Sequence, residues 1–132
     1  MATGCISTTA ISSRDAKPAP KERLFAYQEP DTKRTFPLTV TRDVGILGAG
    51  CDLEFLVGDT KVAIFDTGEV AKFYIEPGIS TLEVNWDQKS TNVLCSSSSP
   101  NFREINATKD GRTKLSLRLA IIGGHPIIGL GS

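Results

Sequence analysis

The sequence predicts an all-β fold, a small antiparallel β-sandwich of about seven to nine short strands. Three features of the stretch from Arg42 to Trp86 support this prediction. Apolar and polar residues alternate there with the period of two that a strand with one buried face requires. Turn residues separate the alternating runs at a spacing of roughly ten residues. No apolar stripe with helical spacing occurs in the stretch, which argues against alternating strands and helices.

The first two strands of this stretch are separated by a glycine turn. Leu53, Phe55 and Val57 are predicted to share the buried face of the first strand. The turn over 58–60 reads Gly-Asp-Thr. Glycine adopts positive φ without steric penalty, and aspartate can accept a hydrogen bond from its own backbone. A second strand is therefore expected over 62–65.

Two further strands follow in the same stretch. The turn over 66–69 reads Asp-Thr-Gly-Glu and precedes a third strand over 70–75. That strand is expected to end at 76–78, Glu-Pro-Gly, because proline fixes φ and has no N–H to donate. The residues Ile79, Leu82, Val84 and Trp86 indicate a fourth strand over 79–86, with Thr81, Glu83 and Asn85 on its solvent-exposed face.

Upstream of this stretch, strands are predicted over 23–28 and 35–42. In the first, Phe25 and Tyr27 alternate with apolar residues on the other face. In the second, Pro37 indicates an edge strand or an early position in a strand, because proline cannot donate to the ladder.

Downstream, 102–107 alternates in polarity, and Asp110-Gly111 favours a two-residue hairpin that leads into a strand over 115–119. The C-terminal segment 121–130, IIGGHPIIGL, is apolar and glycine-rich, but it is too short to span a bilayer. Two interpretations remain open for it: a final strand packed on the sandwich, or a partly exposed patch that meets a partner.

The order of these motifs resembles small bacterial putative lipoproteins. The resemblance depends first on the pattern RD-x-G-x-x-G-x-G-C, which starts at Arg42-Asp43 and ends at Cys51. The Gly-Asp, x-Gly-Glu and x-Pro-Gly turns follow this pattern in the same order as in that group. Upstream, RLFAYQE resembles the opening strand of the same group. These features are similar to the domain of unknown function 2846 and to PEGA-type β modules, over the part of the chain from Arg23 to Leu119. The resemblance implies an envelope-located β-sandwich with no settled biochemical activity.

Length and charge exclude several classes of protein. A chain of 132 residues has the size of one domain and can bury one modest core. Fifteen basic and fifteen acidic residues give no net charge, so no overall field attracts nucleic acid, and no nucleic-acid partner is expected. No run of about 18 apolar residues indicates a transmembrane helix.

The three cysteines are Cys5, Cys51 and Cys95. Cys51 and Cys95 lie in the predicted β region, where two thiols can meet across strands, so a disulfide between them is predicted. It would close a loop of about 45 residues, worth ~4 kcal/mol in the chain-entropy model. The alternative is a reactive thiol. Neither cysteine lies in a C-x-x-C motif or near a helix N-terminus that would favour the thiolate, so we prefer the disulfide.

The N-terminus carries a candidate lipidation site. Ala2-Thr3-Gly4-Cys5 resembles the end of a bacterial lipobox, where small residues precede the cysteine that receives a diacylglyceryl group. No basic and apolar regions of a signal peptide precede it, and we interpret the start as one from which a signal peptide was removed and replaced by Met. The alternative is a chance tetrapeptide at a cytosolic start. Residues 1–21 are predicted to form a flexible tether, and residues 22–132 the β-sandwich domain.

Other candidate sites are weaker. Arg42-Asp43 is interpreted as a surface pair with an Asx-type turn; the alternative is a ligand site. The glycines of 45–50 lack the order and the following helix of a phosphate loop. Serines 96–99 lack a nucleophile elbow. His125, the only histidine, has no acidic or cysteine neighbour in sequence and is interpreted as a loop residue, not a metal ligand.

The leading functional hypothesis is a non-enzymatic, lipid-anchored protein of the bacterial periplasm. It would bind a ligand or support envelope structure, would meet the membrane through Cys5, and would have no catalytic residue, cofactor or metal. The main alternative is a thiol-dependent enzyme or redox protein that uses Cys51 or Cys95, with or without His125. A third hypothesis is a cytosolic β module with three reduced thiols.

Overall fold

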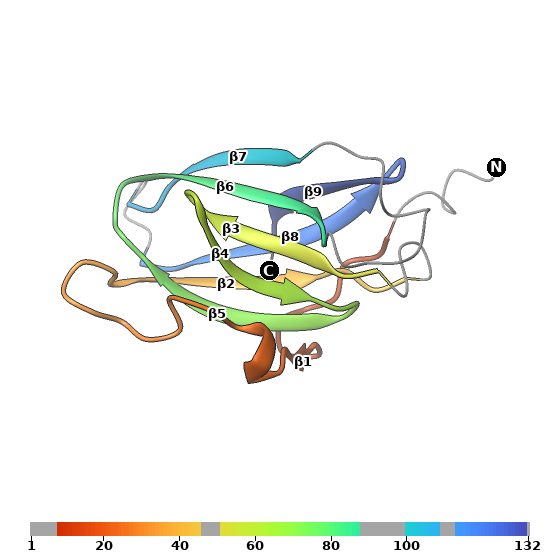
Figure 1. The fold of residues 1–132 in the computed structure, drawn as a ribbon, viewed down its shortest axis with the longest axis horizontal. Coiled ribbons are helices and arrows are strands. Elements are labelled where there is room, and N and C mark those ends of the chain that lie inside the picture. Colours follow the sequence, from red (N-terminus) through yellow and green to blue (C-terminus); the bar gives the residue numbers. More distant parts are fainter. Residues whose placement is uncertain (1–7, 46–50, 88–99, 109–112, 132) are drawn as a thin grey trace.

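The computed structural model, which describes residues 8–45, 51–87, 100–108 and 113–131, is a two-layer β-sandwich (Figure 1). Its described elements are β1 (Lys17–Pro18), the 3-10 turn η2 (Lys21–Arg23), β2 (Phe36–Arg42), β3 (Leu53–Val57), β4 (Thr60–Phe65), β5 (Glu69–Ile75), β6 (Ile79–Trp86), β7 (Asn101–Asn106), β8 (Leu115–Ile122) and β9 (His125–Leu130). One sheet has the order β1-β5-β2-β8-β9 and the other β4-β3-β6-β7. The β1–β5 and β2–β8 pairs are parallel and the others antiparallel. The predicted all-β sandwich is confirmed.

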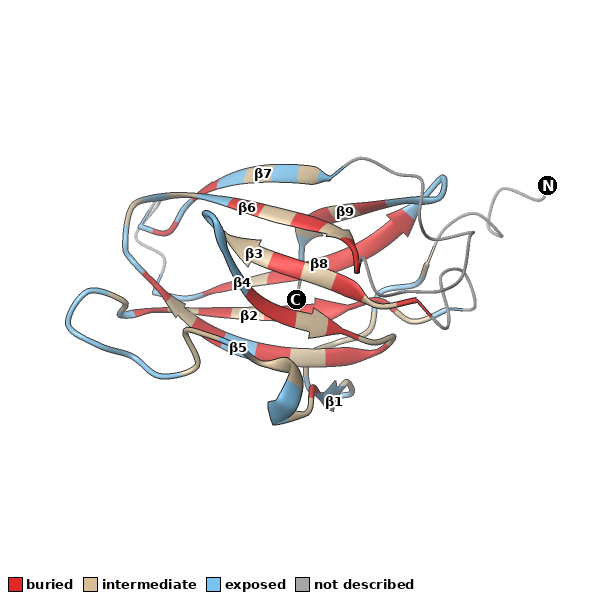
Figure 2. Cartoon of the chain, in the orientation of Figure 1, coloured by how far each residue is buried: buried red, intermediate tan, exposed pale blue. Residues whose placement is uncertain are grey.

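The alternation of apolar residues decides which face of each strand is buried. Over 36–40 of β2 and 115–119 of β8 the inward positions are buried, whereas the positions between them are partly exposed (Figure 2). This follows from the period of two, which sends successive side chains to opposite faces. Pro37 fits at the second position of β2, one residue before the pairing with β8 begins at Leu38.

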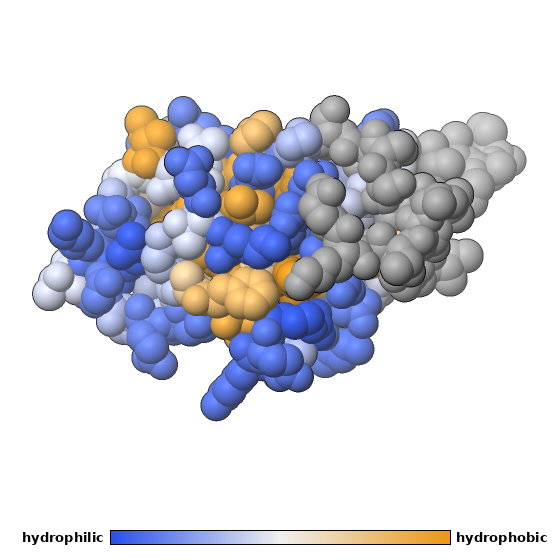
Figure 3. Space-filling model, viewed as in Figure 1, coloured by the Kyte–Doolittle hydropathy of each residue, from blue (hydrophilic) through white to orange (hydrophobic). Residues whose placement is uncertain are grey.

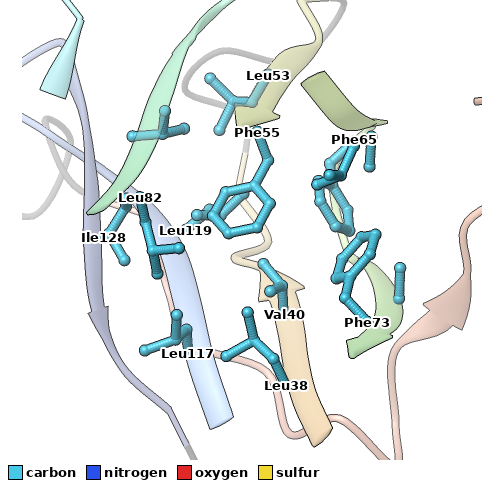
Figure 4. Packing of buried hydrophobic residues seen from close by; sticks show 14 of the residues in the cluster. Leu38, Val40, Leu53, Phe55, Phe65, Phe73, Leu82, Leu117, Leu119 and Ile128 are labelled. Atoms are coloured by element: carbon cyan, nitrogen blue, oxygen red, sulfur yellow. The ribbon is translucent and has the colours of Figure 1, made fainter. Parts of the chain in front are cut away.

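Three phenylalanines from both sheets meet in the core (Figure 4). Phe55 lies on β3, Phe65 on β4 and Phe73 on β5, and none of the three is exposed. The ring centroids of Phe55 and Phe73 are 5.9 Å apart, and each lies 6.4 Å from the centroid of Phe65. Two of the three pairs are edge-to-face, a geometry that aromatic quadrupoles favour. Because the rings come from both layers, this cluster holds the two sheets together.

The predicted strand over 23–28 is wrong. The turn η2 and a single bridge between Leu24 and Ala63 occupy this part of the chain. Tyr27 adopts a φ of +68°, a left-handed conformation that interrupts an extended strand. It lets the chain leave β4 and turn to β5, where the backbone N–H of Tyr74 donates to the Tyr27 carbonyl at 2.8 Å.

The hairpin predicted at Asp110-Gly111 is also wrong, because β7 and β8 belong to different sheets. Asp110 and Gly111 themselves lie outside the residues that the structure describes. A two-residue hairpin instead joins β8 to β9 at Gly123 and Gly124, whose φ angles are +61° and +82°. Positive φ at both central residues defines a type I′ turn. Most of the C-terminal segment is therefore packed as a strand pair, with Ile122 and Leu130 exposed.

The N-terminal segment, residues 8–27, runs along one side of the sandwich and contacts both sheets (Figure 1). It bridges Val44 through Thr9, pairs with β5 through β1, and bridges β4 through Leu24. Residues 8–21 belong to the predicted tether, and their backbone hydrogen bonds to the sandwich include Lys17 to Gly68 and Ala19 to Val70. Backbone pairing does not break at residue 22, the predicted domain boundary. Composition gives little sign of this attachment, because it depends on backbone groups at a sheet edge.

Candidate functional site

Arg42, the last residue of β2, lies inside the sandwich and is 1% exposed. Its Nη1 donates to the carbonyl oxygens of Cys51 at 2.7 Å and Phe65 at 2.8 Å. Burial lowers the pKa of the Arg42 guanidinium, and the field of nearby carboxylates opposes that shift; these belong to Asp66, Asp52, Glu69 and Asp43. An arginine keeps its charge even so, because the guanidinium group is not deprotonated in proteins. Arg42 thus ties the ends of β3 and β4 to β2.

Asp43 follows Arg42 and is also buried, at 2% exposure. Its carboxylate accepts hydrogen bonds from the Thr8 hydroxyl at 2.8 Å and from Arg118 Nε at 3.0 Å, and Arg118 Nη2 donates to it as well. This carboxylate raises the pKa of the Arg118 guanidinium through the side-chain hydrogen bond. Asp43 therefore joins the N-terminal segment to β2 and β8.

Glu69, the first residue of β5, forms a second buried carboxylate contact. Arg23 donates to both of its oxygens, at 2.7 Å and 2.6 Å, and the backbone N–H of Asp66 donates at 2.7 Å. Such bidentate pairs fix the orientation of both side chains. Arg23 also donates to the Ile64 carbonyl at 3.0 Å. The Glu69 hydrogen bond raises the pKa of Arg23, and the pair fastens η2 across the side of the sandwich.

These contacts correct the interpretation of Arg42-Asp43 as a surface pair. Both side chains are buried, and the hydrogen bonds described above engage them with backbone carbonyls, a hydroxyl and Arg118. Their geometry is that of a structural junction, in which the charged groups already have protein partners, and not that of an open ligand site. Within the described ranges, no group of three or more His, Cys, Asp and Glu side chains is arranged to hold a metal ion.

Thr8, the first described residue, is hydrogen-bonded to one end of the sandwich. Its N–H donates to the Ile121 carbonyl at 3.0 Å, and the Ile121 N–H donates to the Thr8 hydroxyl at 2.9 Å. Thr9 and Val44 exchange two backbone hydrogen bonds of 2.9 Å. Together with the Asp43 contact, these bonds form the N-terminal docking site, defined by Thr8, Thr9, Asp43, Val44 and Ile121. Sequence reasoning missed this site, because its partners are far apart in the chain.

Comparison with models of known protein families, with curated proteins and with solved structures found no match. The resemblance to putative lipoproteins therefore stays a prediction, and the function of this chain is argued from its own residues.

The structure describes only one of the three cysteines. Cys51 is completely buried in the hydrophobic core of the sandwich, just before β3. A substrate cannot reach a sulfur in that position, which argues against Cys51 as a nucleophile. Cys5 and Cys95 fall outside the described ranges, so lipidation at Cys5 and pairing of Cys51 with Cys95 stay predictions. His125 is exposed at the start of β9, beside the Gly123-Gly124 turn.

A solvent-open hollow of about 460 Å³ lies at the end of the sandwich where β3 turns into β4 and β5 into β6. Tyr27 and Arg34 form part of its wall. The Arg34 guanidinium carbon lies 4.1 Å from the centroid of the Tyr27 ring, and Arg34 Nη2 donates to the Tyr27 hydroxyl at 3.2 Å. These two side chains hold each other, and the rest of the lining is largely polar, including Asp59, Thr60, Glu76, Ser80 and Thr81.

The outer face of the four-stranded sheet is a further surface. Phe102 on β7 is 59% exposed and lies opposite Glu83 of β6. Burial and the nearby carboxylates of Glu54 and Asp59 raise the pKa of Glu83. On the face shown in Figure 3, hydrophilic residues interrupt the apolar ones. This surface therefore does not present one continuous apolar patch. No helix in the described residues is long and apolar enough to cross a membrane.

Proposed function

We propose that this chain is a non-enzymatic protein of the bacterial cell envelope, held on the periplasmic side of a membrane by a lipid on Cys5. The observation that carries the proposal is the attachment of Thr8, three residues after Cys5, through Ile121 and Asp43. A lipid on Cys5 would therefore be attached only three residues before a part of the chain that is hydrogen-bonded to the sandwich. The lipobox-like tetrapeptide that ends at Cys5 supplies the chemistry of the attachment.

The burial of Cys51 supports this proposal over the thiol-dependent enzyme. A cysteine with no exposed surface behaves as a core residue, and it is also suited to a structural disulfide. Stable disulfides are typical of oxidising compartments such as the periplasm. The proposal therefore includes the Cys51–Cys95 disulfide, with Cys5 as the cysteine that stands apart.

A thiol count tests the disulfide. Protein with an unacylated Cys5 is prepared without reductant, unfolded in denaturant and treated with a thiol reagent. We expect one reactive thiol per chain, and three after reduction. Alkylation before reduction, followed by peptide mapping, should assign the single free thiol to Cys5. Three thiols in the unreduced sample would contradict the pairing and would favour a reducing compartment.

The lipid anchor is tested in cells. When the full gene is expressed in a bacterium, we expect the wild-type protein in the membrane fraction, released by detergent but not by salt or alkali. The Cys5→Ser variant should move to the soluble fraction, because it lacks the sulfur that is acylated. A folded wild-type protein that is entirely soluble, with the same distribution as Cys5→Ser, would contradict the anchor.

A further inference from the structure

The reach between Cys5 and the N-terminal docking site is short. An extended chain spans at most ~3.6 Å per residue, so the Cα atoms of Cys5 and Thr8 are at most about 11 Å apart. An unattached chain from Cys5 to Lys21, by contrast, would reach beyond ~50 Å. Because Thr8 is hydrogen-bonded to Ile121 and Asp43, the shorter limit applies. A lipid on Cys5 would therefore hold this end of the sandwich close to the membrane.

An exposed apolar residue lies beside the same attachment point. Ile121, which pairs with Thr8, is followed by Ile122, whose side chain is 47% exposed. Ile122 lies opposite His125 at the Gly123-Gly124 turn. Both glycines are exposed and carry no side chain that could hold the turn away from a surface. The tip of the β8–β9 hairpin, residues 122–125, is thus a narrow surface with one apolar side chain.

The hollow near Tyr27 lies at the other end of the sandwich. Ile79, in its wall, follows Ile75, which pairs with Phe36 at the start of β2. Ile122, in contrast, lies three residues after Leu119, which pairs with Arg42 at the end of β2. Seven residue steps of β8 at ~3.3 Å each separate the two ends by about 23 Å. Both isoleucines are exposed, so they form a matched pair of reporters.

We propose that the tip of the β8–β9 hairpin rests on the lipid surface of the membrane, with Ile122 at the interface and the hollow near Tyr27 directed away. This inference rests on the proposed lipid anchor at Cys5. The anchor supplies most of the binding, and the hairpin tip sets the orientation. The hollow then faces the aqueous compartment, where a soluble ligand or partner can reach it.

The experiment compares Ile122→Trp with Ile79→Trp in the acylated protein, purified from membranes and reconstituted into phosphatidylcholine vesicles. A second set of vesicles carries bromine on the acyl chains, which quenches tryptophan fluorescence on contact. Trp86 is 4% exposed and contributes the same background to every sample. Tryptophan is well suited to the membrane interface, so the substitution preserves the contact. We expect brominated vesicles to quench Ile122→Trp at least about two-fold more than Ile79→Trp, and Ile79→Trp no more than the wild type.

The outcomes separate the two proposals. Equal quenching at both positions, stronger quenching of Ile79→Trp, or no quenching at either position in a vesicle-bound protein would overturn the orientation and leave the anchor intact. Absence of quenching at both positions is also the result expected if a protein partner, and not lipid, covers the hairpin tip. Absence of acylation on Cys5 would overturn both proposals. If Ile122→Trp does not fold, His125→Trp, its cross-strand neighbour, gives the same readout.

Discussion

Replacing Arg42 with alanine is expected to lower the free energy of unfolding by about 4 kcal/mol. The change leaves the carbonyls of Cys51 and Phe65 without the donor that now reaches them at 2.7 and 2.8 Å. It also removes the positive charge from a buried end of the sandwich that contains several carboxylates. Urea unfolding, followed by circular dichroism, measures the loss. Arg14→Ala is the control, because Arg14 is exposed, and surface substitutions change stability by about 0.5 kcal/mol or less.

The cost of Arg42→Ala is expected to fall at acid pH. Burial, followed by the charge of Asp66, raises the pKa of Asp52 above 3.8, and Arg42 opposes that shift. Without Arg42 the pKa of Asp52 should rise further. A carboxyl with a raised pKa in the folded state stabilises the fold below its unfolded pKa and loses that contribution as pH rises through the folded value. The variant should therefore recover part of its deficit as the pH is lowered from 7 toward 4. A cost that stays below about 1 kcal/mol at pH 7 would contradict the structural role of Arg42.

Replacing Phe55 with alanine is expected to lower the free energy of unfolding by 3–5 kcal/mol, on the order of other buried phenylalanine truncations. Phe55 has no exposed surface and contacts the rings of Phe65 and Phe73, so truncation opens a cavity between the two sheets. Thermal and urea unfolding measure the change.

Two variants make the Phe55 measurement specific. Phe55→Leu keeps much of the volume and should cost less than Phe55→Ala. Phe102→Ala removes a ring from the same sheet, but from a position that is 59% exposed, and should change stability by about 0.5 kcal/mol or less. Equal effects of Phe55→Ala and Phe102→Ala would show that the aromatic cluster does not hold the sheets together.

The sandwich was predictable because apolar and polar residues alternate along its strands, and this local pattern indicates which side chains form the core. Leu115, Leu117 and Leu119 face inward on β8 as their spacing predicts, and Phe55 and Val84 do so on β3 and β6. Sheet membership was not predictable in the same way. Asp110-Gly111 has the propensity for a hairpin, yet β7 pairs with β6 and β8 with β2. A dipeptide carries no information on which distant strand completes each sheet.

The buried charges and the N-terminal attachment could not be predicted from local patterns. The Arg118–Asp43 pair joins residues 75 positions apart, and the Thr8–Ile121 contact joins residues 113 positions apart. Arg42-Asp43 looks like a surface pair, because charged residues are rarely fully buried unless they are paired. Its partners come from distant strands and from the N-terminal segment. A polar composition around Thr8 and Thr9 likewise indicates a linker, although the backbone groups of Ile121 and Val44 bind the segment.

The mass of the N-terminal peptide tests the central claim most directly. Trypsin should release a peptide from Cys5 to Arg14 when the mature protein is isolated from the membrane fraction of cells that express the full gene. We predict that this peptide begins at Cys5 and carries the mass of a diacylglyceryl group on that residue. A peptide in which Cys5 is unmodified and still joined to preceding residues would contradict the lipid anchor and the orientation that follows from it.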